Sequence, residues 1–324
     1  MAVSAGCGRV NYLRPRDAGG PPPDARSSRD ANADVSVPSD PLVVLNTLPD
    51  GPGSLRVVLG YLNEHCAMLG PTTIGFDIPD TDAGLVTLAG GRRVWRIGGD
   101  LEKLPITCAG AVLDGTTQTS RHGDTNPATF GGLPTGEAHV PLSSIPGPEV
   151  ELRGISLRID APDVTVRGLA LRAIELRAAR GLVTECVLGS EPDTLVPVPT
   201  ELRTWGLFYG ESCADTTVRG NVFLFADAPE AGYSGFSFRG GCDRATAEGN
   251  HFSGQGAGSV WDELHLNPAT DHRVIHNYID GTSWEWHIEW VGGTGGEIRD
   301  NTFVGPVRPY NVEAAMTTGN EMIP

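Results

Sequence analysis

The chain has 324 residues, 39% of them hydrophobic, which is enough to bury a sizeable core in one elongated domain or two compact ones. Its formal net charge is −16 and no basic patch stands out, so we expect neither a nucleic acid nor an anionic membrane surface as a partner. The 43 glycines and 25 prolines are many for a helical protein and usual for a chain that turns often.

Residues 1–41 indicate an anchored tether. The small residues of Ser4-Ala-Gly-Cys7 resemble the end of a bacterial lipoprotein signal peptide, although no basic or apolar region precedes them. Residues 14–41 are rich in Asp, Ala, Pro, Gly and Ser and cannot bury enough surface to become ordered. We expect lipidation at Cys7 as the only membrane attachment, because no later stretch is long and apolar enough to span a bilayer. The alternative is an ordinary flexible N-terminus with an incidental cysteine.

A single domain is expected from residue 42 to residue 324, and it opens with a short helix. Ser54 can cap this helix. Its apolar residues fall on one face, and they are Leu55, Val58, Leu59, Leu62 and Cys66. An amphipathic helix ahead of a run of strands suits a lid on the open end of a solenoid, whose first coil would otherwise expose its core and its edge.

The segments around and after this helix carry a resemblance to a known family. Short strands are predicted at residues 73–78, 85–89, 94–97 and 111–113. The motifs lie in residues 46–56, 73–79, 104–107 and 113–118. They resemble the opening of bacterial surface β-helix repeat proteins of the pectate-lyase-like superfamily. Of the Cys-Ser-Leu-Arg-Glu-Ala signature that some members carry, only Ser54-Leu-Arg56 is present. The resemblance implies a fold and a cell-surface location, and it supplies no catalytic motif.

Two long polar excursions interrupt the predicted strands. The first runs from residue 119 to residue 149 and contains His122, Asp124 and His139, and the second runs from residue 190 to residue 203. Long loops that leave a regular scaffold are often functional, and they are also where insertions are tolerated most easily. Both interpretations stay open. Residues 151–157, 164–171 and 174–176, between the excursions, alternate apolar and polar side chains as half-buried strands do.

Residues 206–305 repeat one template four times: an apolar strand, a polar turn and then Asn-x-(Phe/Ile). The asparagines are Asn221, Asn250, Asn277 and Asn301, with spacings of 29, 27 and 24 residues. Repeats of this length are stacked units, and stacked amides at one corner can hydrogen-bond along the axis. The predicted fold class is therefore all-β: a single right-handed parallel β-helix with a short N-terminal capping helix.

The cysteines have suggestive positions in these repeats. Cys213 and Cys242 each lie eight residues before a template asparagine, so they should stack about 4.8 Å apart, within reach of a disulfide. Cys66 and Cys108 could form a second pair, and Cys186 takes the asparagine position of an earlier coil as a buried thiol. Oxidation of the stacked pair would mean an exported protein, whereas two reduced neighbours fit the spacing nearly as well.

Alternation within the strands predicts which side chains face outward. Leu264, Leu266, Trp286 and Ile288 should face the core, because the opposite arrangement would bury carboxylates and an imidazole in an apolar tube. The outward residues are then Glu263, His265, Asn267, Glu285, His287 and Glu289, with Arg239 one coil earlier. Stacking predicts Glu285 beside Glu263 and His287 beside His265. A register shifted by two residues puts Glu289 beside His265 instead.

Such a column has two interpretations. Two carboxylates about 5 Å apart match a retaining glycosidase, and a lyase could use His265 or His287 as base with Arg239 neutralising a uronate. Exposed aromatic residues that could stack on sugar rings are Trp261, Trp284 and Trp290. Equally, the outward residues of any solenoid strand are polar by necessity, and tryptophans commonly fill a core or an end cap.

Neither a metal nor a cofactor is expected. Among the histidines of residues 251–287 no close-spaced pair lies on one face, because His272 and His276 flank a turn, and the usual zinc spacing with cysteine is missing. Calcium at the turn Asp80-Thr-Asp82 is only a weak alternative. The sequence has no phosphate loop, dinucleotide fingerprint or serine nucleophile elbow.

Together these features predict a monomeric lipoprotein of the bacterial outer membrane or cell surface that engages an extended ligand, with carbohydrate as the first choice. One alternative is a polysaccharide lyase or glycoside hydrolase that uses the Glu/His column. Another is an adhesin or structural spacer with a protein partner. Whether the protein is an enzyme stays open at this point.

Overall fold

The computed structural model describes residues 40–132, 142–189, 208–226, 236–255, 262–266, 270–281, 286–290, 294–305, 308–312 and 316–323. These residues belong to one compact unit, which runs from Val37 to Pro324. The unit is mostly β, with two long parallel sheets and two α-helices among the described residues. No helix of the described part is long and apolar enough to cross a membrane. The predicted tether lies outside the described residues except for Asp40 and Pro41, and it stays a prediction.

One sheet has ten short strands, and every neighbouring pair is parallel. In spatial order they are β1 (Val43–Val44), β2 (Thr73–Phe76), β5 (Val112–Asp114), β9 (Thr165–Arg167), β11 (Leu182–Thr184), β14 (Thr217–Arg219), β17 (Thr246–Glu248), β20 (Arg273–Ile275), β23 (Glu297–Arg299) and β26 (Met316–Thr318). The middle residues of successive strands share one register column, and Val183, Val218, Ala247, Val274 and Ile298 in it are all buried. This sheet therefore supplies one wall of the core.

The second sheet has fifteen strands, most of them in two columns that meet at β10 (Leu169–Leu176). The first column is β12 (Val187–Leu188), β15 (Val222–Ala226), β18 (His251–Gln255), β21 (Tyr278–Gly281), β24 (Thr302–Val304) and β27 (Glu321–Ile323). The second column is β13 (Phe208–Gly210), β16 (Phe236–Phe238), β19 (Asp262–Leu266), β22 (Trp286–Trp290) and β25 (Arg308–Val312). Below β10 lie β8 (Val150–Ile159), β4 (Arg93–Ile106) and β3 (Leu85–Thr87), of which only β3 pairs antiparallel.

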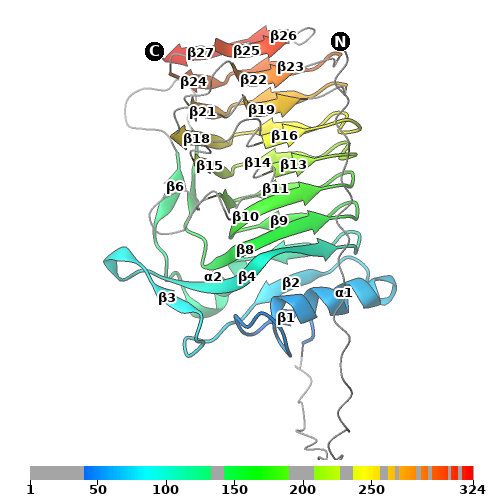
Figure 1. Ribbon diagram of the computed structural model, residues 1–324, viewed down its shortest axis with the longest axis vertical. Coiled ribbons are helices and arrows are strands. Elements are labelled where there is room, and N and C mark those ends of the chain that lie inside the picture. Colours follow the sequence, from blue (N-terminus) through cyan, green and yellow to red (C-terminus); the bar gives the residue numbers. More distant parts are fainter. Residues whose placement is uncertain are drawn as a thin grey trace, which may run out of the picture. The chain divides into compact units, whose positions relative to one another are not determined.

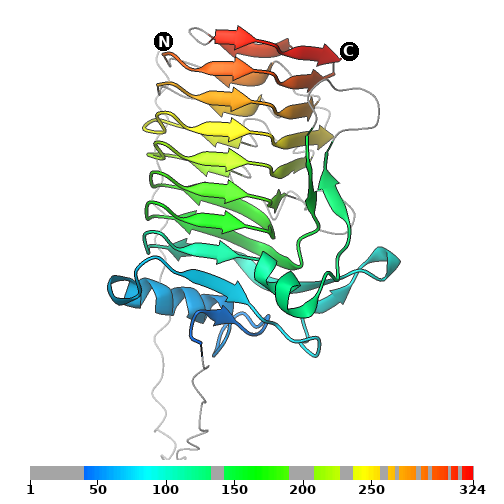
Figure 2. The ribbon, with the colours of Figure 1, turned by 180° about the vertical axis from the view of Figure 1, so that it is seen from behind.

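Figures 1 and 2 show the result as a stack of coils, each passing from the ten-stranded sheet through the first column to the second. Between the sheets lies one continuous hydrophobic core. Aromatic rings stack within it from coil to coil, with ring centroids 4.8 Å apart for Phe223 and Phe252 and 4.7 Å apart for Phe208 and Phe236. The parallel sheets are those of an all-β solenoid, as the repeats predict. The strands form several sheets, however, including a small antiparallel pair outside the stack.

The predicted asparagine column is confirmed, and it is longer than the four repeats indicate. Asn221, Asn250, Asn277 and Asn301 each donate from Nδ2 to Oδ1 of the asparagine on the next coil, at 3.0 Å. The last acceptor is Asn320, a fifth member. Each Oδ1 also accepts the backbone N–H of the coil below, which begins with Cys186 N–H to Asn221 at 3.0 Å. Cys186 thus holds the asparagine position of its coil and is a buried free thiol, and burial raises its pKa to about 12.

The turns on the opposite side of each coil carry a second ladder. Asp163, Arg180, Asp215, Arg244 and Asp271 all have positive φ, between 57° and 61°. Each donates its backbone N–H to a carbonyl of the next coil, at 2.8 to 3.1 Å. Their side chains alternate in charge, with two-point ion pairs between Arg180 and Asp163 and between Arg244 and Asp215.

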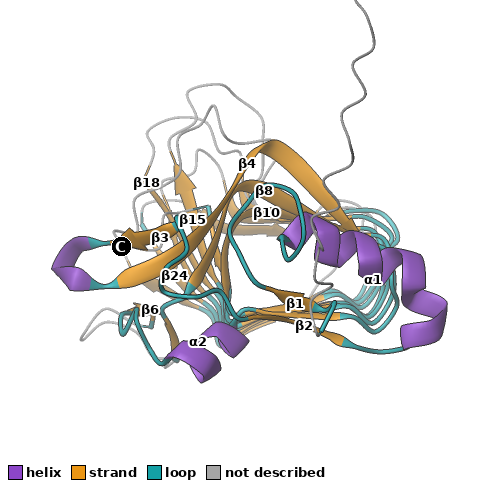
Figure 3. Ribbon diagram, turned by 90° about the horizontal axis from the view of Figure 1, so that it is seen from below, coloured by secondary structure: helices purple, strands orange, loops and turns teal. Residues whose placement is uncertain are grey.

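Helix α1 (Leu55–Leu69) closes the N-terminal end of the stack, as predicted (Figure 3). The Ser54 side chain accepts a hydrogen bond from the backbone N–H of Val57 and caps the helix. The buried face consists of Leu55, Val58, Leu59 and Leu62, which join the main core. The helix thereby covers apolar surface that the first coil would otherwise expose to water.

The first polar excursion differs from the predicted loop. It begins as α2 (Thr116–His122) and continues as the antiparallel hairpin of β6 (Thr129–Gly131) and β7 (Ser144–Pro146) (Figure 2). Phe130 and Ile145 of this hairpin pack on outward residues of the first column and make a second, smaller core with Ala170, Val187, Val222 and Leu224. The outer side of the first column is therefore partly covered by protein. The second excursion, residues 190–203, lies outside the described part.

Both cysteine pairs that the sequence allows, one of which it left open between disulfide and thiols, are disulfides in the structure. Cys213 and Cys242 join successive coils with 4.2 Å between their Cα atoms, and Cys66 of α1 joins Cys108 with 5.3 Å. The second bond fixes the lid to the coil after β4.

Replacement of a central asparagine should destabilise the fold strongly. Asn250→Ala removes the acceptor for two N–H groups of Asn221 and the donor to the Val218 carbonyl, all of them buried. We expect the free energy of unfolding to fall by about 3 kcal/mol, measured by urea denaturation. The matched control is Asn320→Ala at the half-buried end of the column, where water can replace the lost partner. Equal losses in the two variants would contradict a cooperative amide column.

Loss of the inter-coil disulfide should also cost stability. The bond closes a loop with a sequence separation of 29, so the variant Cys213→Ala/Cys242→Ala should lose about 3 kcal/mol. Unfolding is measured with and without dithiothreitol. Reductant should destabilise the wild type more than the variant, which retains only Cys66–Cys108. A wild type that is indifferent to reductant would contradict this expectation.

Candidate functional site

The two columns of the larger sheet meet along a line that we call the loop corner. In β4 the register with β8 shifts between Gly98 and Glu102, and in β10 it shifts between Leu171 and Ala173. From β12 upward the chain leaves this corner and returns after connections of 19, 9, 6, 4 and 3 residues (189–207, 227–235, 256–261, 282–285 and 305–307). Each of these connections therefore runs from the end of a first-column strand to the start of a second-column strand.

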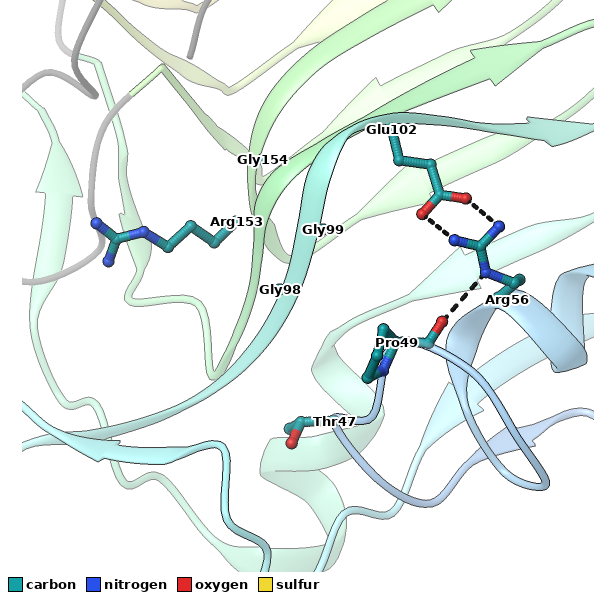
Figure 4. A pocket seen from close by; sticks show the side chains of 8 residues that line it. All are labelled: Thr47, Pro49, Arg56, Gly98, Gly99, Glu102, Arg153 and Gly154. Atoms are coloured by element: carbon teal, nitrogen blue, oxygen red, sulfur yellow. Dashed lines mark hydrogen bonds and ion pairs between the residues drawn. The ribbon is translucent and has the colours of Figure 1, made fainter. Parts of the chain in front are cut away.

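A cleft of about 860 Å³ lies at the lower end of the loop corner (Figure 4). It is lined by Thr47, Pro49, Arg56, Gly98, Gly99, Glu102, Arg153 and Gly154. Arg56 of α1 makes a two-point ion pair with Glu102, with both N–O distances 2.5 Å, and donates from Nε to the Pro49 carbonyl. Figure 4 shows the Arg153 side chain extending away from this pair. The cleft thus combines charged side chains with a glycine floor.

The glycines of the cleft are a sequence signal that the predictions above did not use. A Cβ on Gly99 would lie 2.6 Å from the Ile155 side chain, and Gly154 has a φ of 71°. Glycine inside a strand marks a bulge or a close backbone approach. Gly98 and Gly99, directly after the strand predicted at residues 94–97, could therefore have indicated the cleft, whereas Arg56 and Glu102 meet only through the tertiary fold.

The second column contains the positions predicted to carry chemistry. Register pairs His265 with Glu289 and Leu264 with Ile288, so Glu263 falls opposite His287. The pairing of His287 with His265 and of Glu285 with Glu263 is therefore wrong, and the alternative shifted by two residues is correct. The offset of 24 residues between these strands equals the spacing of Asn277 and Asn301, which sets how far one coil advances.

For the remaining predicted residues the structure gives less. Glu263, His265, His287 and Glu289 are described as strand positions only, and Glu285, Asn267, Trp261 and Trp284 lie outside the described residues. Trp290 shares the register column of Leu266 and Phe238, and Phe238 is buried in the core. The side chain of Trp290 lies outside the described residues, so its role as a sugar-stacking residue stays a prediction.

One register column next to the loop corner is continuous from coil to coil. It runs, rung by rung, through Arg158, Glu175, Tyr209, Ser237, His265, Glu289 and Asn311. We call this set the outer ladder. At its lower end Glu175 binds Lys103 at 3.0 Å and also pairs with Arg177. Burial opposes ionisation of Glu175, but these hydrogen bonds hold its pKa below the usual value.

In the middle of the outer ladder an aromatic ring meets a cation. The exposed Arg239 guanidinium lies 4.9 Å from the centroid of the half-buried Tyr209 ring, and its Nε donates to Ser237 Oγ at 3.4 Å. The Tyr209 hydroxyl lies 3.4 Å from Glu211. A half-buried ring and an exposed guanidinium are therefore held together on this part of the sheet, and the Ser237 hydroxyl that anchors the guanidinium is itself buried. Arg239 was predicted here, and Tyr209 was missed because only tryptophans were considered as platforms.

The start of the first excursion brings together another charged cluster. His122 at the end of α2 lies 2.9 Å from Asp77 through Nε2 and 3.7 Å from Asp80 through Nδ1, and its ring is tilted against Trp95. Arg121 also binds Asp77, at 2.8 Å. Burial opposes ionisation of Asp77, yet the hydrogen bonds from His122 and Arg121 hold its pKa below the usual value. This cluster attaches α2 to the end of β2. Asp124 is exposed, and His139 lies outside the described part.

The described residues contain no group of three or more His, Cys, Asp or Glu side chains placed to hold a metal. The two carboxylates considered for calcium have protein partners. Asp80 pairs with Arg93 at 3.0 Å, while Asp82 accepts hydrogen bonds from Thr47 and from the Gly84 N–H.

Comparison with known proteins adds little to this geometry. No family model matches the sequence, and no curated protein matches it significantly. PfbA, a surface adhesin of Streptococcus pneumoniae, is 11% identical with a TM-score of 0.30, covering 83% of this chain and 85% of that one. Geobacillus virus E2 ORF18 is 7% identical with a TM-score of 0.27, covering 86% and 60%. Similarities this weak support no conclusion about fold or function.

The Asp77 cluster predicts an acid-dependent contribution to stability. A carboxyl whose folded pKa lies below its unfolded value stabilises the protein above the unfolded value, and this contribution is lost as the pH falls through the folded value. Asp77→Asn should therefore be less stable than the wild type at pH 7. The difference should shrink as the pH falls below about 3.8. Urea unfolding at several pH values measures it, with the exposed Asp50→Asn as control. A difference independent of pH would contradict the ionic role.

Proposed function

We propose that this protein is exported and that it binds an extended ligand, with carbohydrate as the first choice, along the outer ladder. Two disulfides support export, because such bonds form and persist in oxidising compartments. A lipid anchor at Cys7 and a place on the bacterial surface are part of this proposal. So is the closure of the coils into one right-handed parallel β-helix, since parallel crossovers are right-handed in nearly all sheets.

The observation that carries the ligand proposal is the pair of Tyr209 and Arg239, with the buried Ser237 hydroxyl accepting a hydrogen bond from the guanidinium. Carbohydrate sites combine an aromatic surface for the apolar face of a sugar with a few fixed polar groups for its hydroxyls. On the first column the hairpin of β6 and β7 covers such outward positions, but the pair on the second column includes the exposed Arg239. Parallel coils repeat these positions along the axis, so a chain-like ligand would meet equivalent contacts on successive rungs.

Removal of the aromatic ring tests this function. Purified protein is applied to a panel of neutral and acidic polysaccharides, and retention is measured by affinity electrophoresis. Tyr209→Ala should weaken retention about tenfold, the effect of losing roughly 1.4 kcal/mol of contact free energy. The matched control is Tyr61→Ala, which removes a half-buried tyrosine from α1, away from the outer ladder.

Two outcomes would contradict the proposal. If wild type retains no glycan, the outer ladder does not bind carbohydrate, and the adhesin or spacer with a protein partner becomes the better interpretation. If Tyr209→Ala and Tyr61→Ala bind as tightly as the wild type, a glycan binds elsewhere on the protein.

Cleavage of the bound glycan is the second candidate function, favoured by the register that sets His265 directly opposite Glu289 on the next coil. An imidazole and a carboxylate on adjacent rungs are suited to general acid–base chemistry. Cleavage would produce new chain ends in the same panel, and His265→Ala would abolish them while leaving retention intact. His276→Ala, at a turn position beside Asp300, is the control. Retention without new chain ends would exclude this second function.

A further inference from the structure

One arginine of the larger sheet differs from the others. Arg172 lies in β10 at the loop corner, where a register of Leu171 with Leu152 changes to one of Ala173 with Ser156. Three residues of β8, Arg153, Gly154 and Ile155, therefore lie opposite this single residue. Arg172 is thus one rung above the Arg153–Gly154 wall of the cleft and next to the lower end of the outer ladder.

Arg172 is buried, and two of its nitrogens have no partner among the described residues. The residue is only 3% exposed, and both Nε and Nη2 are buried with no hydrogen-bond acceptor in that part of the chain. Burial lowers the pKa of the guanidinium, with no neighbouring carboxylate to oppose the shift. By contrast, partly exposed arginines on the same coils have acidic partners, as Arg158 has Asp160 and Arg177 has Glu175. Among the arginines that the structure describes, Arg172 is the most deeply buried, and no charge from a described carboxylate compensates it.

A second polar group without a described partner lies on the adjacent strand. Ser156 is the register partner of Ala173, the residue after Arg172, and its Oγ is buried with no hydrogen-bond partner among the described residues. Two orphaned groups on adjacent rungs are unusual, because buried polar atoms are nearly always satisfied by protein, water or an ion. The nearby carboxylates of Glu151 and Glu175 are already engaged by Arg96 and Lys103.

We propose that Arg172 and Ser156 form a subsite for an oxyanion, either a carboxylate or a sulfate group. The groups offer N–H and O–H donors, which suit an acidic oxygen and exclude a cation. A guanidinium binds planar or tetrahedral oxyanions through paired N–H donors. The net charge of −16 gives no long-range attraction for an anion, so recognition has to come from such a local site.

If the protein binds glycans as proposed above, the subsite makes an acidic glycan the preferred ligand. Only this assignment to a glycan rests on the proposed function. An acidic sugar on the lower rungs of the outer ladder would carry its charged group toward the loop corner. The binding of an oxyanion as such depends on Arg172 and Ser156 alone. The two claims can therefore be tested separately.

The first experiment uses the whole protein and simple salts. Thermal unfolding is followed in sodium chloride, sodium sulfate and sodium glucuronate at equal ionic strength, for wild type, Arg172→Met and the charge-matched control Arg219→Met. Arg219 is an exposed residue of the ten-stranded sheet. Relative to chloride, we expect sulfate or glucuronate to raise the Tm of wild type and of Arg219→Met. This increase should exceed the increase for Arg172→Met by about 2 °C or more. In chloride alone, Arg172→Met should be at least as stable as wild type, because it removes an unpaired buried charge.

The second experiment repeats polysaccharide retention with the same variants and with Ser156→Ala. Polygalacturonate and a sulfated glycan should be retained about tenfold less by Arg172→Met, and a neutral glucan equally by all variants. Equal Tm responses of wild type and Arg172→Met would overturn the subsite. Sulfate or glucuronate could raise the Tm only of proteins that contain Arg172, while Arg172→Met retains acidic glycans as well as the wild type does. That result would overturn the assignment of the subsite to glycans. If no glycan is retained at all, the outer-ladder proposal fails while the salt comparison still decides the subsite.

Discussion

The buried column of asparagine amides is the constraint on which the rest of this structure depends. Each Oδ1 receives two N–H groups from the coil below, and each Nδ2 donates upward and to a backbone carbonyl. The column therefore fixes the height and the rotation of every coil against the next. Because the strands on either side are short, most of them two to five residues long, they could slip without such a fixed point. The outer ladder and the disulfide between coils are consequences of that alignment.

Features that repeat along the chain could be predicted from the sequence. The asparagine column, the stacked Cys213–Cys242 pair and the lid helix follow from spacing and periodicity, which are local and visible in one dimension. The order of β19 and β22 was also accessible, since the 24 residues between Asn277 and Asn301 give the correct pairing of His265 with Glu289. The error came from aligning strand starts instead of asparagines.

Features that depend on distant partners could not be predicted. Helix α2 and the hairpin after it look like a polar loop in the sequence, because the residues that stabilise them lie elsewhere in the chain. His122 contacts Asp77. Phe130 and Ile145 pack against Val187 and Val222. The cleft depends on the ion pair between Arg56 and Glu102, which are 46 residues apart in the sequence. Arg172 is the limiting case, because the absence of a partner is a property of the packed structure and leaves no trace in residue order.

The alternating Asp and Arg side chains of the second turn ladder make the coils non-interchangeable. Asp163, Arg180, Asp215, Arg244 and Asp271 follow one another in space, so each of the three inner charges has an opposite neighbour above and below. Removing one inner coil, by deletion or by recombination between repeats, would set two like charges side by side. Removing two adjacent coils would restore the alternation. This side of the solenoid should thus tolerate a change in length in steps of two coils more readily than in steps of one.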